Sequence, residues 1–265
     1  MIGSTHNRCF VFGCSFTGHI TGTWADYLGA NFNQYYNFGR GGACNTYILN
    51  KFIEADTLYN FNPKDDYIVV MFTSFSRFSF YNKYGWNCLG SVFNNPTHFK
   101  EFVNNMWTED QGIYNSWIAI NTIKKILTLK GIKHKLLLGT DAMHNNNNNE
   151  FDDTLYNRLS PKLEKEFESL LDDTESMMSW QNQHFKFPQD FYYYEDEGYV
   201  DSHPTQLIHY TYMKEKFPEF DTPISKKRYE YAESIYVKGN MKQQAEAFTT
   251  VFTPKYNRAY HSPTF

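Results

Sequence analysis

The sequence lacks a hydrophobic run long enough to span a bilayer, because no stretch of about 18 consecutive apolar residues occurs in it. It also lacks a basic segment followed by an apolar segment at the N-terminus, so we expect synthesis in the cytoplasm without a signal peptide. Charge of one sign is not in excess either, since 25 basic residues face 29 acidic ones. We therefore expect neither nucleic acid nor a membrane as a partner.

Patterns typical of metal sites are missing as well. The four cysteines include no C-x-x-C pair, and the nine histidines include no H-E-x-x-H pattern. We expect reduced thiols, no metal and no organic cofactor. A chain of 265 residues buries a core large enough to fold without disulfides or a structural metal.

Aromatic residues, in contrast, are abundant. Phe, Trp and Tyr make up 19% of the chain, and hydrophobic residues as a whole make up 41%. We expect a core and clefts built from rings more than from aliphatic side chains. Asn is frequent and Lys far outnumbers Arg, which indicates an AT-rich genome and favours a bacteriophage or virus as the source.

Short apolar runs alternate with helix-like stripes. Strands are predicted at 8–13, 35–38, 67–72 and 132–138, and helices at 24–28, 45–59, 117–129, 152–171, 206–216 and 226–248. The segments 76–96 and 179–200 are aromatic and irregular, and we expect loops there. This order predicts a three-layer α/β/α sandwich around a mainly parallel sheet of about five strands.

No clear linker divides the chain. We expect one main domain over residues 1–220, with an aromatic insert at about 144–200 that walls a cleft, and a C-terminal helical extension and tail at 221–265. The insert contains a tract of five Asn at 145–149, which is typical of a solvated loop. The aromatic residues of the tail at 249–265 suit an arm that docks on a second subunit, so a homo-oligomer or a virion subunit is expected.

Ser15 is the first candidate for chemistry. It follows a predicted buried strand, at the edge of the sheet where open α/β proteins bind ligands. A serine nucleophile needs a base within hydrogen-bond reach, and the base needs an orienting partner. His203, just before a predicted helix, fits the base, and Asp201 fits the partner. Helix capping by Ser15 and an ordinary turn at His203 are the structural alternatives.

A Gly-rich turn, Gly39-Arg40-Gly41-Gly42, follows the second predicted strand. Its glycines allow backbone N–H groups to approach a substrate oxygen, and Asn37 and Asn45 flank it with side-chain amides. A phosphate-binding loop is the rival interpretation. The turn matches neither G-x-G-x-x-G nor the P-loop pattern, so a nucleotide-binding protein is disfavoured.

Taken together, these segments resemble the SGNH (GDSL-type) hydrolases. Gly13-Cys14-Ser15 is similar to the nucleophile block, Asn37 to Gly42 to the second block, and Asp201-Ser202-His203-Pro204 to the last block. The resemblance implies an SGNH/flavodoxin-like fold and a serine esterase with a Ser15–His203–Asp201 triad. It also implies an oxyanion hole that uses Gly42, with Asn45 and Ser74 as further donors.

Three positions depart from the family pattern. Cys14 stands beside the nucleophile where the family has Asp, and a Cys14 thiol nucleophile is a weaker alternative than a packed small side chain. Ser74 stands where the third block has Asn, and Arg77 either compensates or binds an acidic substrate. One residue instead of two separates Asp201 from His203, so Asp196, Glu197 or a backbone carbonyl are substitutes for Asp201.

The expected substrates are small acyl esters, including O-acetyl groups on a glycan. A run of three tyrosines at 192–194 suits either sugar stacking or loop packing. The alternative to an enzyme is a catalytically degraded virion, tail or glycan-binding protein that keeps the hydrolase fold. The Ser74 and Asp201 departures favour that alternative, and the retained pair of Ser15 and His203 favours the esterase.

Overall fold

A computed structural model describes residues 6–19, 21–92, 101–102, 105–140, 169–186, 189, 191, 193–194, 199–200 and 203–235. The predicted Asn tract, most of the predicted helix at 152–171 and the tail at 249–265 lie outside these residues. The role of the tail in assembly therefore stays a prediction.

The centre of the molecule is a parallel sheet. Strands β1 (Arg8–Phe12), β2 (Gln34–Asn37), β3 (Asp66–Phe72) and β6 (Lys133–Leu138) lie in the order β2-β1-β3-β6, and every neighbouring pair is parallel. The described sheet thus has four strands where about five were predicted. β3 is buried along its whole length, as its continuous apolar sequence requires between two helical layers.

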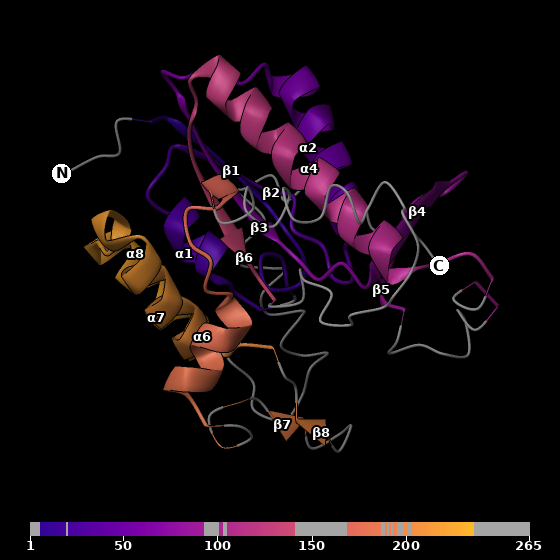
Figure 1. Ribbon diagram of the computed structural model, residues 1–265. Coiled ribbons are helices and arrows are strands. Elements are labelled where there is room, and N and C mark those ends of the chain that lie inside the picture. Colours follow the sequence, from indigo (N-terminus) through magenta and orange to yellow (C-terminus); the bar gives the residue numbers. More distant parts are fainter. Residues whose placement is uncertain are drawn as a thin grey trace.

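Helices cover both faces of the sheet. On one face, α2 (Asn45–Tyr59) packs along α4 (Glu109–Lys130). On the other face, α1 (Trp24–Gly29) packs against α7 (Gln206–Lys216) and α8 (Pro223–Ser234). Figure 1 shows the sheet between these two helical layers, and the predicted three-layer α/β/α class is confirmed.

Several shorter elements also belong to the described fold: the helix α6 (Met177–His184), the two-stranded ribbon β7 (Tyr193–Tyr194) and β8 (Tyr199–Val200), and the 3-10 turn η1 (Pro218–Phe220). The prediction of irregular chain over 179–200 was wrong where α6 forms. Ser176 caps this helix, because its side chain accepts a hydrogen bond from Ser179 N–H.

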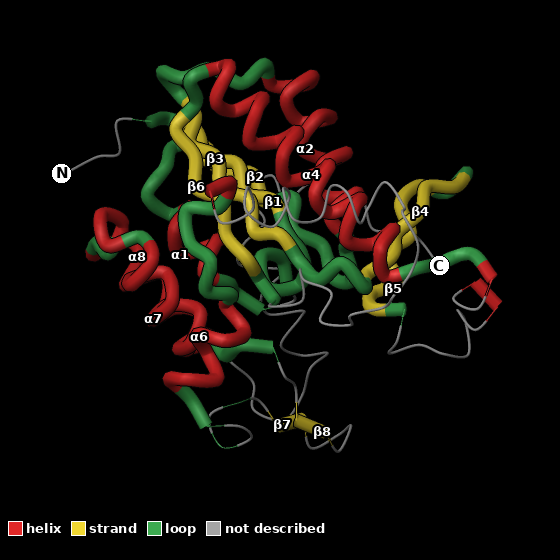
Figure 2. Tube along the Cα trace, in the orientation of Figure 1, coloured by secondary structure: helices red, strands yellow, loops and turns green. Residues whose placement is uncertain are grey.

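The prediction of a loop over 76–96 was also wrong. It contains an antiparallel hairpin of β4 (Arg77–Asn82) and β5 (Gly85–Ser91) that stands away from the central sheet (Figure 2). β4 contacts α2, so the hairpin is anchored to one helical layer rather than to the strands.

Stacked rings fill the core, as the composition predicts. Phe10 lies on Tyr36 with ring centroids 4.7 Å apart, and Phe12 lies on Phe38 at 4.9 Å, each pair within 7° of parallel. These pairs join β1 to β2 and to the residue that follows it, and such stacking adds about 0.5–1.5 kcal/mol per pair beyond simple burial. The edge of the sheet beside Ser15 is therefore held by rings on neighbouring strands.

The predicted C-terminal extension begins inside this body. α8 contacts both α1 and α7, and Thr222 starts it with a capping box that uses Ser225. No helix in the described part of the chain combines the length and apolarity needed to cross a membrane.

Candidate active site

The turn that carries Ser15 is compact. β1 ends at Phe12, and the N–H groups of Thr17 and Gly18 both donate to the carbonyl oxygen of Cys14, at 3.0 Å. Gly13 is required here, because an added Cβ would come within 2.1 Å of Thr17 Oγ1. Ser15 is 5% exposed, and its hydroxyl makes no hydrogen bond to the described residues.

Asn37 joins this turn to the Gly-rich turn. Its Nδ2 donates to the carbonyl oxygen of Thr17 at 2.8 Å, and its Oδ1 accepts from Gly39 N–H at 2.8 Å. The two turns also touch directly, since a Cβ on Gly18 would lie 2.4 Å from the Gly39 carbonyl oxygen. The sequence suggested Asn37 as a substrate donor, and its amide instead positions the two turns.

Gly42 turns the chain toward the hairpin. Its φ of +72° lies in the left-handed region, and an added Cβ would come within 2.6 Å of the Cys88 carbonyl oxygen. Its own carbonyl accepts a hydrogen bond from Gly90 N–H at 3.1 Å. The hairpin therefore approaches the Gly42 backbone closely, and the prediction of an oxyanion donor at Gly42 stays a prediction.

Asn45 has no spare donor. Its Nδ2 donates to the carbonyl oxygen of Thr73 at 2.7 Å and to Ser116 Oγ at 2.9 Å, while its Oδ1 accepts from Thr73 N–H. Both N–H bonds of this buried amide are occupied, so we revise the prediction of Asn45 as an oxyanion donor. The Asn45 side chain instead holds the start of α2 against the end of β3 through its hydrogen bonds to Thr73.

Ser74 and Arg77 follow β3 toward the hairpin. Ser74 Oγ lies 2.8 Å from Ser76 Oγ, which lies 3.2 Å from Ser91 Oγ, so the three hydroxyls form a chain. Arg77 opens β4 and is half-buried. Ser74 Oγ also accepts a hydrogen bond from Ser76 N–H at 3.2 Å, and when the Ser76 hydroxyl is the donor of the pair, the Ser74 hydroxyl keeps its own proton for a substrate.

His203 lies at the Ser15 turn. Its ring meets Phe16, the neighbour of Ser15, edge-on with centroids 5.7 Å apart, and it stacks on His19 at 4.5 Å. The structure thus brings His203 to the turn that bears Ser15 from the other end of the domain. No hydrogen bond joins the two residues here, and Asp201, Asp196 and Glu197 lie outside the described residues.

A third histidine lies beneath this pair. His209 on α7 is 1% exposed, and its Nδ1 has no hydrogen-bond partner. Burial first, and then the nearby His19 and His203, hold the pKa of His209 well below its usual value. The sequence offered no spacing that would reveal this cluster, because the three histidines come from two distant segments.

The cysteine side chains are buried or half-buried in the protein. Cys14 is fully buried beside Ser15, and all four cysteines are free thiols. This fits the interpretation of Cys14 as a small core side chain. Within the described ranges, no group of three or more His, Cys, Asp or Glu side chains has a geometry that could hold a metal ion.

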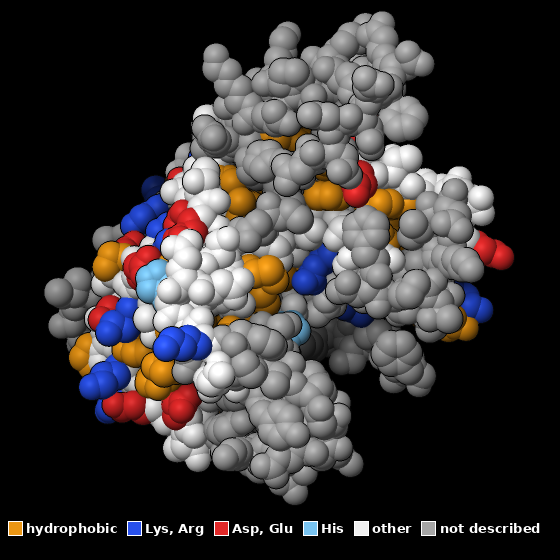
Figure 3. Space-filling model, turned by 60° about the horizontal axis from the view of Figure 1, so that its bottom comes forward, with side chains coloured by type: hydrophobic (Ala, Val, Ile, Leu, Met, Phe, Trp, Pro, Cys, Tyr) orange, Lys and Arg blue, Asp and Glu red, His pale blue; other side chains and the backbone are white. Residues whose placement is uncertain are grey.

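A pocket of about 250 Å³ opens where α2 and α4 begin, against the β4–β5 hairpin, and its described lining contains neither Ser15 nor His203. The first residues of α2, Phe75, β4 and the first turns of α4 line it, and they include the predicted Asn45 and Arg77. Figure 3 shows a hollow on the lower face with a histidine and basic side chains at its edge, and the described lining of the pocket contains no histidine. The wall formed by α4 was not predicted from the sequence, because polar residues such as Gln111 and Asn115 are typical of an ordinary exposed helix face.

The described fold and turns define a three-layer α/β protein with a serine and a histidine at the carboxyl edge of a parallel sheet. No protein-family model and no curated protein matches the sequence. Solved structures are similar to it. A member of the lipolytic protein G-D-S-L family from Veillonella parvula has a TM-score of 0.40 at 12% identity, over 79% of this chain and 97% of that one.

Two further solved structures are similar to this chain to about the same degree. Axe2, an acetylxylan esterase from Geobacillus stearothermophilus, has a TM-score of 0.42 at 15% identity, over 84% of this chain and 97% of that one. LAE5, an alpha/beta hydrolase enzyme from the metagenome of Lake Arreo in Spain, has a TM-score of 0.41 at 13% identity, over 83% of this chain and 97% of that one.

Proposed function

We propose that this protein is a serine ester hydrolase of the SGNH type. The observation that carries the proposal is the contact of His203 with Phe16, which brings a base to the turn of the candidate nucleophile Ser15. Catalytic hydrogen bonds are often long or absent without substrate and tighten when it binds, so the missing bond between Ser15 and His203 does not oppose the proposal.

In the proposed reaction, Ser15 Oγ attacks the carbonyl carbon of the ester while His203 takes the hydroxyl proton. The negative charge on the carbonyl oxygen is met by the N–H groups of Gly42 and Ser15, and Ser74 is a further donor. His203 returns the proton to the leaving alcohol. Water then attacks the acyl-enzyme with His203 as base, releases the acid and restores Ser15.

Asp201 is the proposed orienting partner of His203, with Asp196 and Glu197 as the alternatives. Losing the proper orientation of a catalytic histidine costs up to about 10⁴ in kcat in serine hydrolases. Acetyl esters on a glycan are the proposed substrates. The acetylxylan esterase among the similar structures has that chemistry, and this chain is proposed to share it.

Hydrolysis of p-nitrophenyl acetate tests the proposal. We expect activity in the wild type and a loss of about 10³-fold or more in Ser15→Ala and His203→Ala. Ser234→Ala, at the exposed end of α8, is the matched control and should retain full activity.

A fluorophosphonate probe provides the second readout, because it labels an activated serine whatever the natural substrate. Labelling of the wild type that disappears in Ser15→Ala supports the hydrolase. Equal hydrolysis in all variants, with no labelling of Ser15, would instead favour a hydrolase fold retained for glycan binding in a virion or tail.

A further inference from the structure

The pocket where α2 and α4 begin has an uneven charge. Among the described residues that line it, Arg77 is the only one with a charged side chain. Arg77 is half-buried and forms no ion pair with the described residues. A partly desolvated guanidinium that pairs with no carboxylate in the described part of the chain favours an anionic ligand, because its five donors match a carboxylate in a two-pronged geometry.

Two helices add to this field. α2 and α4 both begin at the pocket, with Cys44, Asn45 and Thr46 from one and Gln111 and Gly112 from the other among the lining. The N-terminal end of a helix carries a partial positive charge. Acidic residues occur in the first turn of α4, but they are not part of the pocket wall, and the first turn of α2 has none.

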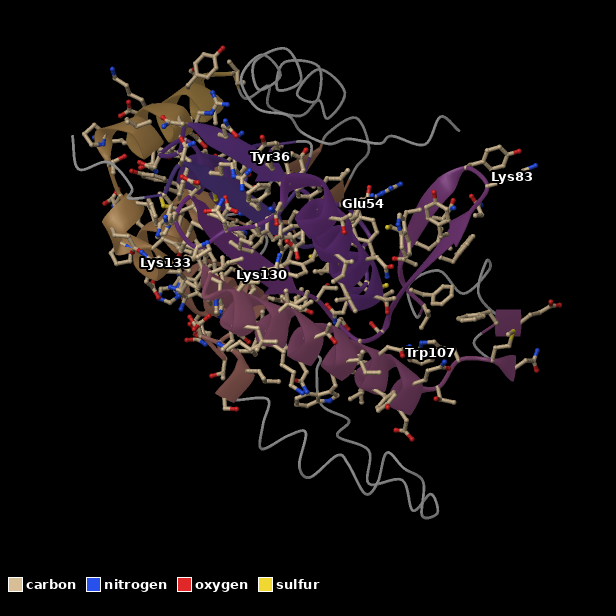
Figure 4. The ribbon with its side chains drawn as sticks, turned by 90° about the horizontal axis from the view of Figure 1, so that it is seen from above. Tyr36, Glu54, Lys83, Trp107, Lys130 and Lys133 are labelled. Atoms are coloured by element: carbon tan, nitrogen blue, oxygen red, sulfur yellow. The ribbon has the colours of Figure 1, made fainter. Side chains whose placement is uncertain are left out.

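The remaining wall combines amides with rings. The side chains of Gln111 and Asn115 on α4 are exposed and make no hydrogen bond to the described protein. Phe75, Phe78 and Trp107 supply flat apolar surface. Figure 4 shows Trp107 between the start of α4 and the β4–β5 hairpin. Unpaired amides suit hydroxyl groups, and rings suit the apolar faces of a sugar.

Position links the pocket to the candidate active site. Asn45 on its wall is bonded to Thr73, directly after β3, and Gly42 lies just before α2. β3 is the neighbour of β1, so the pocket and the Ser15 turn share the carboxyl edge of the sheet. At about 250 Å³ the pocket is at or below the lower end of the size range of small-molecule sites, which fits one sugar residue.

We propose that this pocket binds a carboxylate-bearing sugar, with the Arg77 guanidinium on the carboxylate. If the protein is the esterase proposed above, its substrate is an ester carried on an acidic, uronate-containing glycan. The second statement rests on the proposed function, whereas the binding of the sugar acid does not.

Calorimetric titration of the full-length protein with D-glucuronate tests the proposal, with D-glucose as the neutral counterpart. We expect glucuronate to bind and glucose to bind at least about tenfold more weakly. Arg77→Gln should weaken glucuronate binding by at least about tenfold. Lys83→Gln removes a cation from the exposed tip of the same hairpin, outside the pocket, and should leave binding unchanged.

Two further variants distinguish binding of the sugar acid from esterase activity and from a change in folding. Ser15→Ala should bind glucuronate like the wild type, so the inference stands even if no esterase activity is found. Asn115→Ala should weaken binding of the sugar acid without affecting the fold, since Asn115 is exposed. Equal binding of glucose and glucuronate, no binding of glucuronate, an undiminished Arg77→Gln variant, or inorganic phosphate binding as tightly as glucuronate would each overturn the proposal.

Discussion

Asn37 connects two turns with a single side chain. Its amide satisfies the carbonyl of Thr17 beyond Ser15 and the N–H of Gly39 at the start of the Gly-rich turn. Thr23 Oγ1 donates to the same Thr17 carbonyl at 2.8 Å. The distance between the candidate nucleophile and the candidate oxyanion loop therefore depends on a residue that need not touch the substrate.

Replacing Asn37 by Ala should cost about 2–3 kcal/mol of stability, because it removes two hydrogen bonds and leaves Gly39 N–H without its partner. Ester hydrolysis should fall with it, mainly in kcat, as the turns loosen. Urea unfolding and hydrolysis kinetics measure both effects. Asn33→Ala, at an exposed amide of the same region, should change neither.

Asn37→Asp separates the two halves of this role. The aspartate keeps the acceptor for Gly39 N–H but faces the Thr17 carbonyl with an oxygen instead of a donor. Stability as high as that of the wild type in Asn37→Asp would contradict the importance of the bond to Thr17.

The β4–β5 hairpin is the element that gives the pocket its charged wall. One of its attachments is the bond from Gly90 N–H to the Gly42 carbonyl, and another is the hydrogen bond that Ser79 Oγ accepts from Cys44 N–H at 3.2 Å. The hairpin thus lies against the N-terminus of α2 and the Gly-rich turn that precedes it. A substitution that strains the backbone of that turn should therefore also displace the hairpin.

Gly42→Ala and Gly90→Ala form a matched pair for this element. Both glycines have a positive φ, of +72° and +77°, so both variants carry the left-handed penalty of about 1–2 kcal/mol. A Cβ on Gly90 meets open space, whereas one on Gly42 meets the Cys88 carbonyl. We therefore expect the larger loss of unfolding free energy in Gly42→Ala, and equal losses in denaturant titrations would argue against the close approach.

The sequence predicted the regular elements well where the pattern was local. The bounds of α2 and α7 agree with the predicted 45–59 and 206–216, since each has a clear apolar stripe and a capping residue at its start. α4 begins earlier than its predicted 117, because Thr108 caps a polar first turn that the apolar stripe does not reveal. The hairpin escaped prediction because its strands are only half-buried and lack strict alternation.

The candidate site was predicted only in part, for a related reason. Ser15 and the Gly-rich turn could be predicted because each directly follows a strand that the apolar pattern indicates. The occupied amide of Asn45, the contact between His203 and His19, and the pocket wall from α4 all depend on segments distant in sequence. Contacts between distant segments produce no periodic pattern of apolar residues within either segment, so the sequence does not reveal them.

At the scale of the whole molecule, His209 ties folding stability to pH. Its folded pKa lies well below the unfolded value of about 6.5, so the unfolded chain binds the proton more readily. Stability is unaffected by this group above pH 6.5 and falls as the pH drops through that value toward the folded pKa.

His209→Gln should remove this part of the acid sensitivity. We expect a shallower dependence of the unfolding free energy on pH below about 6.5. Urea unfolding at a series of pH values measures it. A wild-type slope in His209→Gln would mean that the buried ring is not the group that titrates.

The separate hairpin that carries Arg77 also has a consequence for ligand preference. The strand ends that hold the candidate nucleophile belong to the central sheet, whereas the charged wall belongs to an appendage with its own pairing and only local attachments. On the two proposals made above, exchanging that hairpin would alter which ligands bind and leave Ser15 and His203 in place. A change confined to this hairpin is therefore expected to change the proposed ligand preference.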